Sequence, residues 1–390
     1  MKSLELFSGA GGLAKGLECA GFEHSAFVEF NKHACATLRD NFDAEKVYFG
    51  DIRDFDFSRL QGVDIVAGGP PCQPFSLGGK HRAYQDNRDM FPCAIRAIEE
   101  LAPKAFIFEN VKGLLRASFA EYFEYIMWRL AYPGFKAAEG QGWHDHLAKL
   151  RKLSTLAYTG TRYDVHFKLV NAADYGVPQT RERVVIVGLR TDLGLQWRYP
   201  DPTHSEDRLL WDKLITRDYW KRHAVPSQEG AVQSVAAGQA AARLKDKYGL
   251  FEPERLPWQT VRDALVGLPD PRASHGMAEH QYRAGARAYP GHTGSDLDWP
   301  SKTIKAGDHG VPGGENMIRY PDGSVRYYTV CEAKRIQTFP DAFLVSGAWG
   351  EAMRQIGNAV PVHLGQVFGT ALAETLRNEK NLCRRSVASG

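Results

Sequence analysis

The sequence predicts an α/β protein with a doubly wound, mostly parallel sheet and a smaller inserted domain. Residues 1 to about 190 alternate short apolar runs with amphipathic segments of helical length, which is typical of a parallel sheet covered by helices. From about residue 195 Pro, Gly, Trp and Tyr become frequent and this rhythm fades, and it returns near Val330. A chain of 390 residues is also too long for one compact core, which favours two domains.

The predicted elements follow from those runs. The candidate strands are Leu4–Phe7, Ser25–Glu29, Val63–Ala67, Phe106–Glu109, Tyr163–Leu169 and Val184–Leu189. The candidate helices are Gly12–Ala20, His33–Asn41, Phe91–Leu101, Ala120–Leu130, an Ala-rich stretch Gly230–Lys247 and a closing segment Val360–Asn378. Right-handed crossovers bring the loops after parallel strands to one edge of the sheet, where ligands bind.

The changes in rhythm divide the chain into three parts. We expect a main domain over residues 1–192, a smaller inserted domain over 193–327, and a segment over 328–390 that rejoins the main domain. Hydrophobic residues make up 43% of the chain and charged residues 24%, which is typical of a soluble globular protein. No apolar run reaches the roughly 18 residues of a membrane-spanning helix, and the first residues do not resemble a signal peptide.

The six cysteines, at positions 19, 35, 72, 93, 331 and 383, form no CxxC pair and no Cys/His cluster with zinc-ligand spacing. We therefore expect free thiols, no metal and a reducing cytoplasmic setting. The formal net charge is only +3, and residues 195–330 hold 18 Lys and Arg against 17 Asp and Glu. Binding to a nucleic acid would therefore need positive charge gathered on one face.

A glycine-rich turn, FSGAGG, follows the first strand and opens a helix. Its spacing is not GxGxxG, which argues against a dinucleotide. Glu29 ends the second strand, where doubly wound folds bind ribose hydroxyls, and Asp51 follows a short third strand, where it could accept a hydrogen bond from an adenine amino group. This order fits an adenosine-containing ligand that lacks phosphates. The alternative is a structural glycine turn with two solvated acids.

The segment GGPPCQPFS follows the next strand and contains Cys72. Paired glycines and three prolines fix an unusual backbone around this one thiol. A lone cysteine is usually a small buried hydrophobic residue. Because Cys72 follows a strand at the ligand-binding edge, a reactive thiolate is favoured, and its pKa must be lowered by a helix N-terminus or by nearby cations.

A carboxylate and an arginine pair follow at neighbouring strands. Glu109 ends a buried strand, and Arg181 and Arg183 precede another. An acid and an arginine at neighbouring sheet edges can hold a planar heterocycle by its polar rim. The alternative is a structural ion pair between Glu109 and an arginine.

In their order, these motifs resemble those of the cytosine-5 DNA methyltransferases of restriction–modification type. From N- to C-terminus the motifs are FSGAGG, GGPPCQPFS, ENVKGL, QTRER, RIQTFP and IGNAVP. The resemblance covers about residues 1–190 and 328–378. It implies the Rossmann-like fold of S-adenosylmethionine-dependent methyltransferases, with S-adenosylmethionine as the cofactor. Glu5 stands where the first motif usually has Asp, which is a mild departure.

The resemblance implies a role for each matching position. Cys72 would attack carbon 6 of the target cytosine, Glu109 would contact nitrogen 3 and the exocyclic amine, and Arg183 the carbonyl oxygen, with Arg181 assisting. Glu29 would bind the ribose of the cofactor, Asp51 its adenine, and Ile52 would pack on the adenine ring. The other implied cofactor contacts are Phe7, Gly9, Ala10, Gly11, Gly12, Pro71, Asn358 and Ala359.

The implied chemistry explains this set of residues. Carbon 5 of cytosine is a poor nucleophile, and addition of a thiolate at carbon 6, with charge stabilised at nitrogen 3, turns the ring into an enamine that attacks a methyl sulfonium. Loss of the carbon 5 proton and of the thiol restores aromaticity. The base must leave the duplex stack for this reaction, so a second domain is needed to hold the DNA.

Residues 195–327 correspond in position to the target recognition domain of that family. The segment Trp299–Lys305, which contains Lys302–Lys305, resembles the Thr-Ile/Leu element found there. The implied DNA contacts are Gln73, Ser76, Lys302, Thr303, Ile304 and Lys305. Arg319 and Arg326 are further candidates for phosphate or guanine contacts. For any one of these cations the alternative is a solvated surface charge.

The resemblance implies double-stranded DNA as the partner, a monomer, and a bacterial enzyme of the cytoplasm and nucleoid that protects host DNA from a restriction endonuclease. That endonuclease would be a functional partner rather than a physical one. Two alternatives are an RNA cytosine-5 methyltransferase, which the insertion of roughly 130 residues disfavours, and a non-catalytic DNA-binding regulator. A NAD-dependent oxidoreductase is disfavoured because GxGxxG is absent. The sequence does not predict the DNA site.

Overall fold

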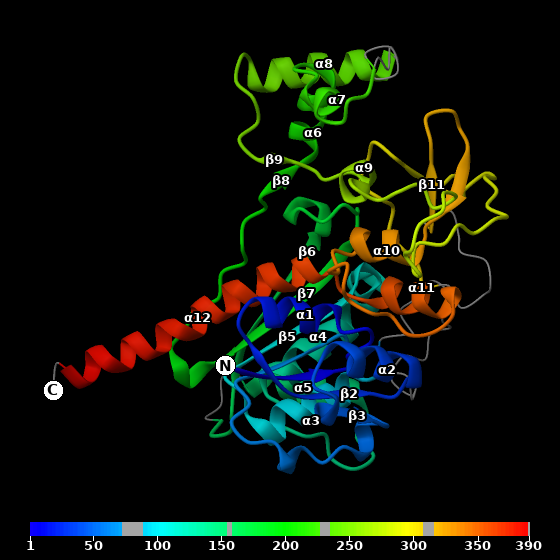
Figure 1. Ribbon diagram of the computed structural model, residues 1–390. Helices are drawn as coiled ribbons and strands as arrows, with labels where there is room; N and C mark the ends of the chain where they lie inside the picture. The colour runs from blue at the N-terminus through cyan, green and yellow to red at the C-terminus, as the bar shows by residue number, and fades with distance from the viewer. Residues whose placement is uncertain (72–88, 154–157, 227–234, 307–315, 389–390) are drawn as a thin grey trace.

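The computed structural model describes residues 1–71, 89–153, 158–226, 235–306 and 316–388, with residues 379–388 as backbone only. A seven-stranded sheet in the order β3-β2-β1-β4-β5-β7-β6 forms its centre (Figure 1). β1 to β5 pair in parallel, whereas β7 is antiparallel to both of its neighbours. The strands are β1 (Lys2–Leu6), β2 (Glu23–Glu29), β3 (Val47–Phe49), β4 (Ile65–Gly68), β5 (Ala105–Val111), β6 (Tyr163–Asn171) and β7 (Glu182–Arg190). The predicted mostly parallel α/β fold is confirmed.

Helices cover both faces of the sheet, as the apolar strands require. The flanking helices are α1 (Gly12–Cys19), α2 (Lys32–Asn41), α3 (Phe91–Leu101), α4 (Ala120–Ala131), α5 (Trp143–Leu153) and α12 (Val362–Ala388). Side chains of α3 and α4 share one buried cluster with strand residues such as Leu4 and Phe106. Leu17 of α1 and Phe368 of α12 share the cluster on the opposite face with Ile65 and Ile107.

Glycines allow the last helix to lie directly against the first. A Cβ at Gly16 of α1 would be 2.5 Å from the carbonyl oxygen of Val362, and one at Gly365 of α12 would be 3.4 Å from the Cα of Gly16. A larger residue at Gly16 would therefore separate the two helices. In Figure 1, α12 runs beside α1 across the sheet, so residues near the two ends of the chain share one face.

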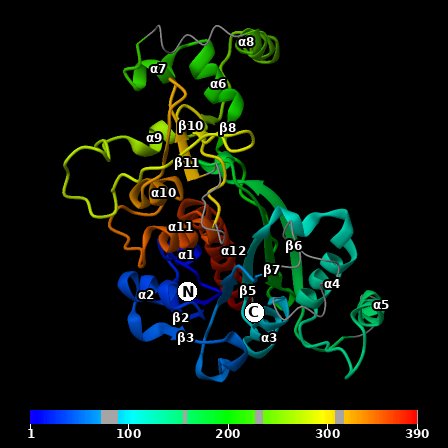
Figure 2. The same ribbon diagram turned by 90° about the vertical axis from the view of Figure 1, so that its right-hand side faces the viewer.

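The segment between β7 and α12 holds further elements. They are β8 (His204–Ser205), α6 (Glu206–Leu214), α7 (Asp218–Arg222), α8 (Val235–Tyr248), β9 (Leu256–Pro257), α9 (Val261–Leu265), β10 (Ser295–Asp296), β11 (Met317–Arg319), β12 (Val325–Tyr327), α10 (Val330–Ile336) and α11 (Trp349–Asn358). Of these, α6 to α9 stand above the sheet in Figure 2, while α10 and α11 lie beside its upper part. Val261, Ile304 and Ile318 pack with Ile336 and Ile356 in one buried cluster. Residues on both sides of the expected boundary at 327/328 therefore share a core.

Local signals in the sequence explain several helix starts. Asn31 caps α2 by accepting hydrogen bonds from the backbone N–H groups of His33 and Ala34. Thr329 and Glu332 form a capping box at α10. The predicted span Phe91–Leu101 matches α3 at both ends. The helices α6, α7 and α9 were not predicted. α7 and α9 have only five residues each, too few to show a helical period, and α6 lies where the regular alternation of strands and helices fades.

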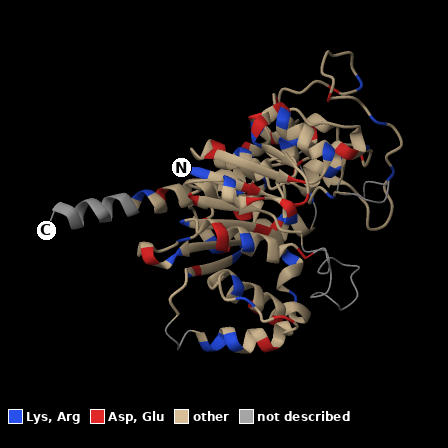
Figure 3. Ribbon diagram, turned by 90° about the horizontal axis from the view of Figure 1, so that it is seen from below, with Lys and Arg blue, Asp and Glu red and all other residues tan. Residues whose placement is uncertain are grey.

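Two further properties bear on the kind of protein. No helix among the described residues is long and apolar enough to cross a membrane. Within the same residues, no three His, Cys, Asp or Glu side chains gather as metal ligands would. Figure 3 shows Lys and Arg interspersed with Asp and Glu over the helices in that view, as the near-zero net charge suggests.

Candidate active site

The glycine-rich turn after β1 lies at the carboxyl edge of the sheet. Phe7, Gly9 and Gly11 all have a positive φ, of 53°, 54° and 80°. A Cβ at Gly9 would meet no atom within 4 Å, whereas one at Gly12 would be 2.2 Å from the carbonyl oxygen of Val360. Gly9 therefore faces open space where a ligand could lie, and Gly12 allows close packing of α1 against the chain before α12.

The Glu29 carboxylate is bound to this turn. Its Oε2 accepts a hydrogen bond of 2.8 Å from the backbone N–H of Gly9, and its Oε1 accepts from Phe30 at 3.0 Å and Asn31 at 2.8 Å. Burial raises the pKa of Glu29, and these backbone hydrogen bonds act against that shift. Because Oε1 accepts two bonds and Oε2 only one, Oε2 keeps a lone pair that can accept a ligand hydroxyl.

Asp51 follows β3, also at the carboxyl edge. It caps the short turn Ile52–Asp54 through the backbone N–H of Arg53, and its carboxylate also forms an ion pair with the Arg53 guanidinium at 2.9 Å. These bonds lower the pKa of Asp51. The Asp51 side chain is 41% exposed, so the pair contributes little to stability and can yield to a ligand. Ile52 is buried, and its carbonyl oxygen accepts from Arg96 at 2.6 Å.

Hydrogen bonds hold the described residues that precede and follow the segment with the predicted nucleophile. The Nδ2 of buried Asn110 donates to the carbonyl oxygen of Pro70 at 3.0 Å. The backbone N–H of Met90 donates to the carbonyl oxygen of Pro71 at 3.2 Å. The described residues before and after 72–88 therefore meet beside the end of β5. Three of the predicted site residues lie outside the described residues: Cys72, Gln73 and Ser76.

Glu109 on β5 and Arg183 on β7 meet beside that place. Their Oε1 and Nε atoms are 2.7 Å apart, and both side chains are 12% exposed. By distance this is an ion pair, yet neither atom has a well-aligned hydrogen bond with a described partner. The two charges therefore attract each other without a strong hydrogen bond, because hydrogen bonds weaken steeply at poor angles. A Cβ on Gly69 would be 3.8 Å from the Glu109 Oε2, so the carboxylate borders the loop before Cys72 and can still bond a base.

Arg181 bonds backbone carbonyl groups rather than Glu109. It is 1% exposed, and its Nη2 donates to the carbonyl oxygen of Gly357 at 3.0 Å, while Nη1 makes a longer contact of 3.5 Å to that of Ile304. Burial, with the nearby Arg183 charge, holds the pKa of Arg181 well below its usual range, although Glu109 opposes the shift. The structure therefore places the Arg181 guanidinium against the backbone carbonyl groups of Ile304 and Gly357.

The element Lys302–Lys305 is partly buried. Ile304 is 1% exposed within a buried cluster, and its backbone N–H donates to Gln179 at 3.0 Å. The Thr303 hydroxyl donates to the carbonyl oxygen of Thr180 at 2.9 Å. The Ile304 side chain is thus turned inward in this structure, whereas Lys302 and Lys305 are exposed.

Two candidate DNA contacts from the sequence are held in ion pairs. Arg326 is 4% exposed and bonds both carboxylate oxygens of Glu332, at 2.6 and 2.7 Å. Burial alone would lower the pKa of Arg326, but the bonds to Glu332 raise it. The expectation of a phosphate or guanine contact for Arg326 is therefore wrong, because its donors are used inside the protein. Arg319 pairs with Asp296 at 2.5 Å.

A buried polar network that the sequence did not reveal joins three of the motifs. Gln179 is fully buried and donates to Gln337 at 2.9 Å, and Gln337 donates to the carbonyl oxygens of Ile356 at 2.6 Å and Ala359 at 3.1 Å. Asn358, between these two residues, is exposed. Gln179 and Gln337 belong to QTRER and RIQTFP, so the motifs signalled their importance, but not that they bond each other.

Gly357 lies where the backbone next to this network is packed too closely to admit a side chain. A Cβ there would be 2.7 Å from the Lys305 carbon and the Ala306 nitrogen, whereas one at Gly350, in the same helix, would meet nothing within 4 Å. We expect Gly357→Ala to lower the free energy of unfolding by about 1–3 kcal/mol through overpacking. Gly350→Ala is the matched control and should leave it unchanged or raise it by up to about 1 kcal/mol. Urea denaturation measures both, and equal values for the two variants would contradict the packing.

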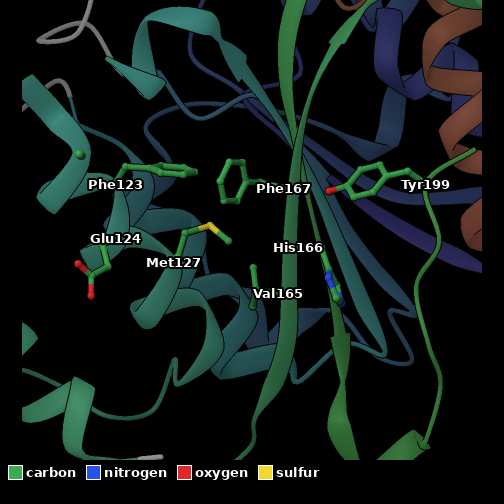
Figure 4. Close-up of a pocket in the computed structure, with 8 residues that line it drawn as sticks. Phe123, Glu124, Met127, Val165, His166, Phe167 and Tyr199 are labelled. Atoms are coloured by element: carbon green, nitrogen blue, oxygen red, sulfur yellow. The ribbon is translucent and has the colours of Figure 1, made fainter. Parts of the chain in front are cut away.

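The hollow in Figure 4 is not part of this site. It is lined by residues of α4, β6 and Tyr199, and the rings of Phe123 and Phe167 meet edge to face at 4.8 Å on one side of β6. None of the predicted site residues lines it. The predicted site lies instead at the carboxyl edge of the sheet.

Comparisons with known proteins give consistent results. The profile of the family described as C-5 cytosine-specific DNA methylase matches residues 1–138 and 143–374. Type II methyltransferase M.PspPI of Psychrobacter sp. (strain TA137) is 36% identical over 96% of this chain and 79% of its own length. Type II methyltransferase M.NgoMIV of Neisseria gonorrhoeae is 32% identical over 97% and 98%. The S. pombe Dnmt2 methyltransferase structure has a TM-score of 0.55 at 16% identity, covering 97% of this chain and 99% of that one, and shares the fold.

Proposed function

The chain belongs to the C-5 cytosine-specific DNA methylase family, and we propose that it transfers a methyl group from S-adenosylmethionine to carbon 5 of a flipped cytosine through Cys72. It is a DNA cytosine-5 methyltransferase. We propose the identity of its methyl donor, the residues of its active site and a reaction through Cys72. The observation that carries the route is the Glu109–Arg183 pair, which borders the loop before Cys72.

The residues present fit S-adenosylmethionine. The open space at Gly9 can admit a ligand against the backbone, and the remaining lone pair on the Glu29 Oε2 suits a ribose hydroxyl donor. The low pKa of Asp51 keeps its carboxylate as an acceptor for an adenine amino group. We assign to the same pocket the other predicted contacts, Phe7, Ala10, Gly11, Ile52, Pro71, Asn358 and Ala359. When bound, this cofactor supplies a methyl group on a sulfonium.

The protein's own groups would activate the base. The Cys72 thiolate forms a bond to carbon 6 of the cytosine, and the electron pair displaced from the carbon 5–carbon 6 double bond reaches nitrogen 3, which takes a proton from Glu109. S-adenosylmethionine, held by the residues named above, would supply the methyl group to carbon 5 and leave as the neutral thioether. A base then removes the carbon 5 proton, the Cys72–carbon 6 bond breaks so that the thiolate is regenerated, and nitrogen 3 returns its proton to Glu109. Arg183 would bond the carbonyl oxygen of the cytosine.

We assign Arg181 a positioning role in this scheme. Its guanidinium bonds the carbonyl oxygens of Ile304 and Gly357, so it ties the Lys302–Lys305 element to the predicted cofactor residues that follow Gly357. Thr303 and Ile304 would then act by placing the backbone, while Lys302 and Lys305 would face the DNA with Gln73 and Ser76.

The biological setting is also a proposal. The relatives named above are Type II methyltransferases, and we propose that this enzyme, a cytoplasmic monomer acting on double-stranded DNA, protects host DNA from a partner restriction endonuclease. Residues 193–327 would form its target recognition domain, between a catalytic domain over 1–192 and a rejoining segment over 328–390. This insertion disfavours an RNA substrate, and the presence of Cys72, Glu109 and Arg183 disfavours a non-catalytic regulator.

Bisulfite sequencing tests the proposed function. DNA from cells that express the gene is expected to show protected cytosines at one short recurring sequence, and DNA from cells that express a Cys72→Ser variant should show none. A wild-type sample without any protected sequence would contradict the function. Methylation found on RNA alone would favour the RNA alternative.

The cofactor assignment predicts the effect of a change at Glu29. We expect Glu29→Gln to weaken S-adenosylmethionine binding about 10- to 100-fold, because a hydrogen bond to a charged group contributes about 1.5–3 kcal/mol. Isothermal titration calorimetry without DNA measures this dissociation constant. Glu23→Gln, at the exposed start of the same strand, is the control and should bind as the wild type does. Equal affinities of the two variants for S-adenosylmethionine would contradict the assignment of Glu29 to the cofactor site.

A further inference from the structure

The segment between α9 and β10 contains an exposed loop that is rich in arginine. We define the arginine loop as residues 271–294, drawn in yellow tones beside α10 and α11 in Figure 1. It holds Arg272, Arg283 and Arg287 but only one acidic residue, Glu279. Most of its residues are exposed, including Tyr282 at 43% and Tyr289 at 47%. Arginines interleaved with exposed aromatic residues are typical of nucleic-acid surfaces.

The base of the loop is fixed, so the exposed part does not float free of the protein. The backbone N–H of Cys331 donates to the carbonyl oxygen of Glu279 at 3.0 Å, and the Glu279 carboxylate pairs with Lys334. His280 is fully buried, with its ring 2.8 Å from the Thr329 hydroxyl. The part that follows these anchors carries Arg283 and Arg287.

Three acidic residues within or close to the loop in the sequence are paired with cations outside it. Glu279 pairs with Lys334, Asp296 with Arg319, and Asp298 with Arg262. Among the described residues, none of the three loop arginines has an acidic partner within ion-pair distance. These three carboxylates therefore do not cancel the positive charge that the three arginines place on the loop.

Aromatic rings support two of these arginines. The Arg283 guanidinium lies 4.3 Å from the ring centre of Trp349, the first residue of α11, and that of Arg272 lies 5.0 Å from Tyr282. Trp349 is itself held, because its Nε1 donates to the carbonyl oxygen of Tyr328 at 3.1 Å. Stacking uses the face of a guanidinium and leaves its N–H groups free to donate.

We propose that the arginine loop binds phosphates of the DNA backbone through Arg283 and Arg287. The loop ends beside the predicted recognition element, because the Lys302 Nζ donates to the Thr293 hydroxyl at 2.9 Å. Within the described part of the chain, no hydrogen bond or ion pair holds the Arg287 side chain in the geometry needed to distinguish a base, which favours phosphates. This inference rests on duplex DNA being the substrate and adds a contact that the motifs do not contain.

The salt dependence of DNA binding tests the proposal. For the Arg283→Ala/Arg287→Ala variant, the slope of log K against log salt should fall by about 2, since each lost phosphate contact removes about 0.9. The affinity should fall by the same factor for a duplex with the site found by bisulfite sequencing and for an unrelated duplex. The Arg283→Lys/Arg287→Lys variant keeps both charges and should retain the slope.

The matched control removes two charges elsewhere. Arg243→Gln/Lys245→Gln lies on α8, which Figure 1 places at the far end of this region from the sheet, and should leave the slope unchanged. A wild-type slope in the loop variant, or a loss confined to the duplex with the site, would overturn the proposal. Bisulfite sequencing separates this proposal from the proposed function. If the wild-type enzyme methylates DNA and the loop variant keeps the wild-type salt dependence, only the proposed phosphate contacts of the loop are contradicted.

Discussion

Methyl transfer is expected to fall by more than about 10³-fold when Cys72 is replaced by serine, because a serine hydroxyl is not ionised near neutral pH and cannot add to carbon 6 as a thiolate does. Binding of S-adenosylmethionine and of DNA should remain measurable, since neither depends on the bond that Cys72 forms. Incorporation of a tritiated methyl group into duplex DNA measures the rate.

A second cysteine gives the control for this change. Cys19 is exposed at the end of α1 and has no role in the proposed route, so Cys19→Ser should methylate DNA at the wild-type rate. A Cys72→Ser enzyme that retains full turnover would show that the reaction does not pass through this thiol.

The second large effect is expected at Glu109. Glu109→Gln should lower kcat by about 10²- to 10³-fold, because the amide cannot give a proton to nitrogen 3 while the Cys72 thiolate adds. The change also removes the ion pair with Arg183. Single-turnover kinetics at saturating DNA separate this loss from weaker binding.

Glu182 offers a matched control for Glu109. It lies on β7 beside Arg183, is exposed, and pairs with Lys112 at 2.8 Å, so Glu182→Gln removes a nearby carboxylate outside the proposed pocket. We expect its kcat to stay within about twofold of the wild type. A Glu109→Gln enzyme that behaves like this control would leave the carboxylate with a structural role only.

Much of the sheet could be predicted because its signals are local. The span of α3 was predicted to the residue, and the six expected strands overlap β1, β2, β4, β5, β6 and β7. Apolar runs and glycine-rich turns of a few residues carry this information. The motifs also predicted that a carboxylate and an arginine from neighbouring strands meet, and Glu109 and Arg183 do.

The rest of the site depends on contacts between distant segments. The bonds from Gln179 to Gln337 and from Arg181 to Gly357 join residues more than 150 positions apart, and no pattern within either segment predicts such a partner. Arg326 and Glu332 are only six positions apart, but no local pattern distinguishes a buried pair from a cation at the surface. An arginine in a sequence can bind DNA or hold the protein together, and only its surroundings distinguish these roles.

Covalent trapping tests the central claim most directly. A duplex that carries 5-fluorocytosine at the target position should form a stable adduct with the wild-type enzyme in the presence of S-adenosylmethionine, because fluorine cannot leave carbon 5 as a proton does. Peptide mapping should locate the adduct on Cys72, and the Cys72→Ser variant should form none. An active wild-type enzyme that forms no adduct, or one whose adduct maps to another residue, would contradict the account.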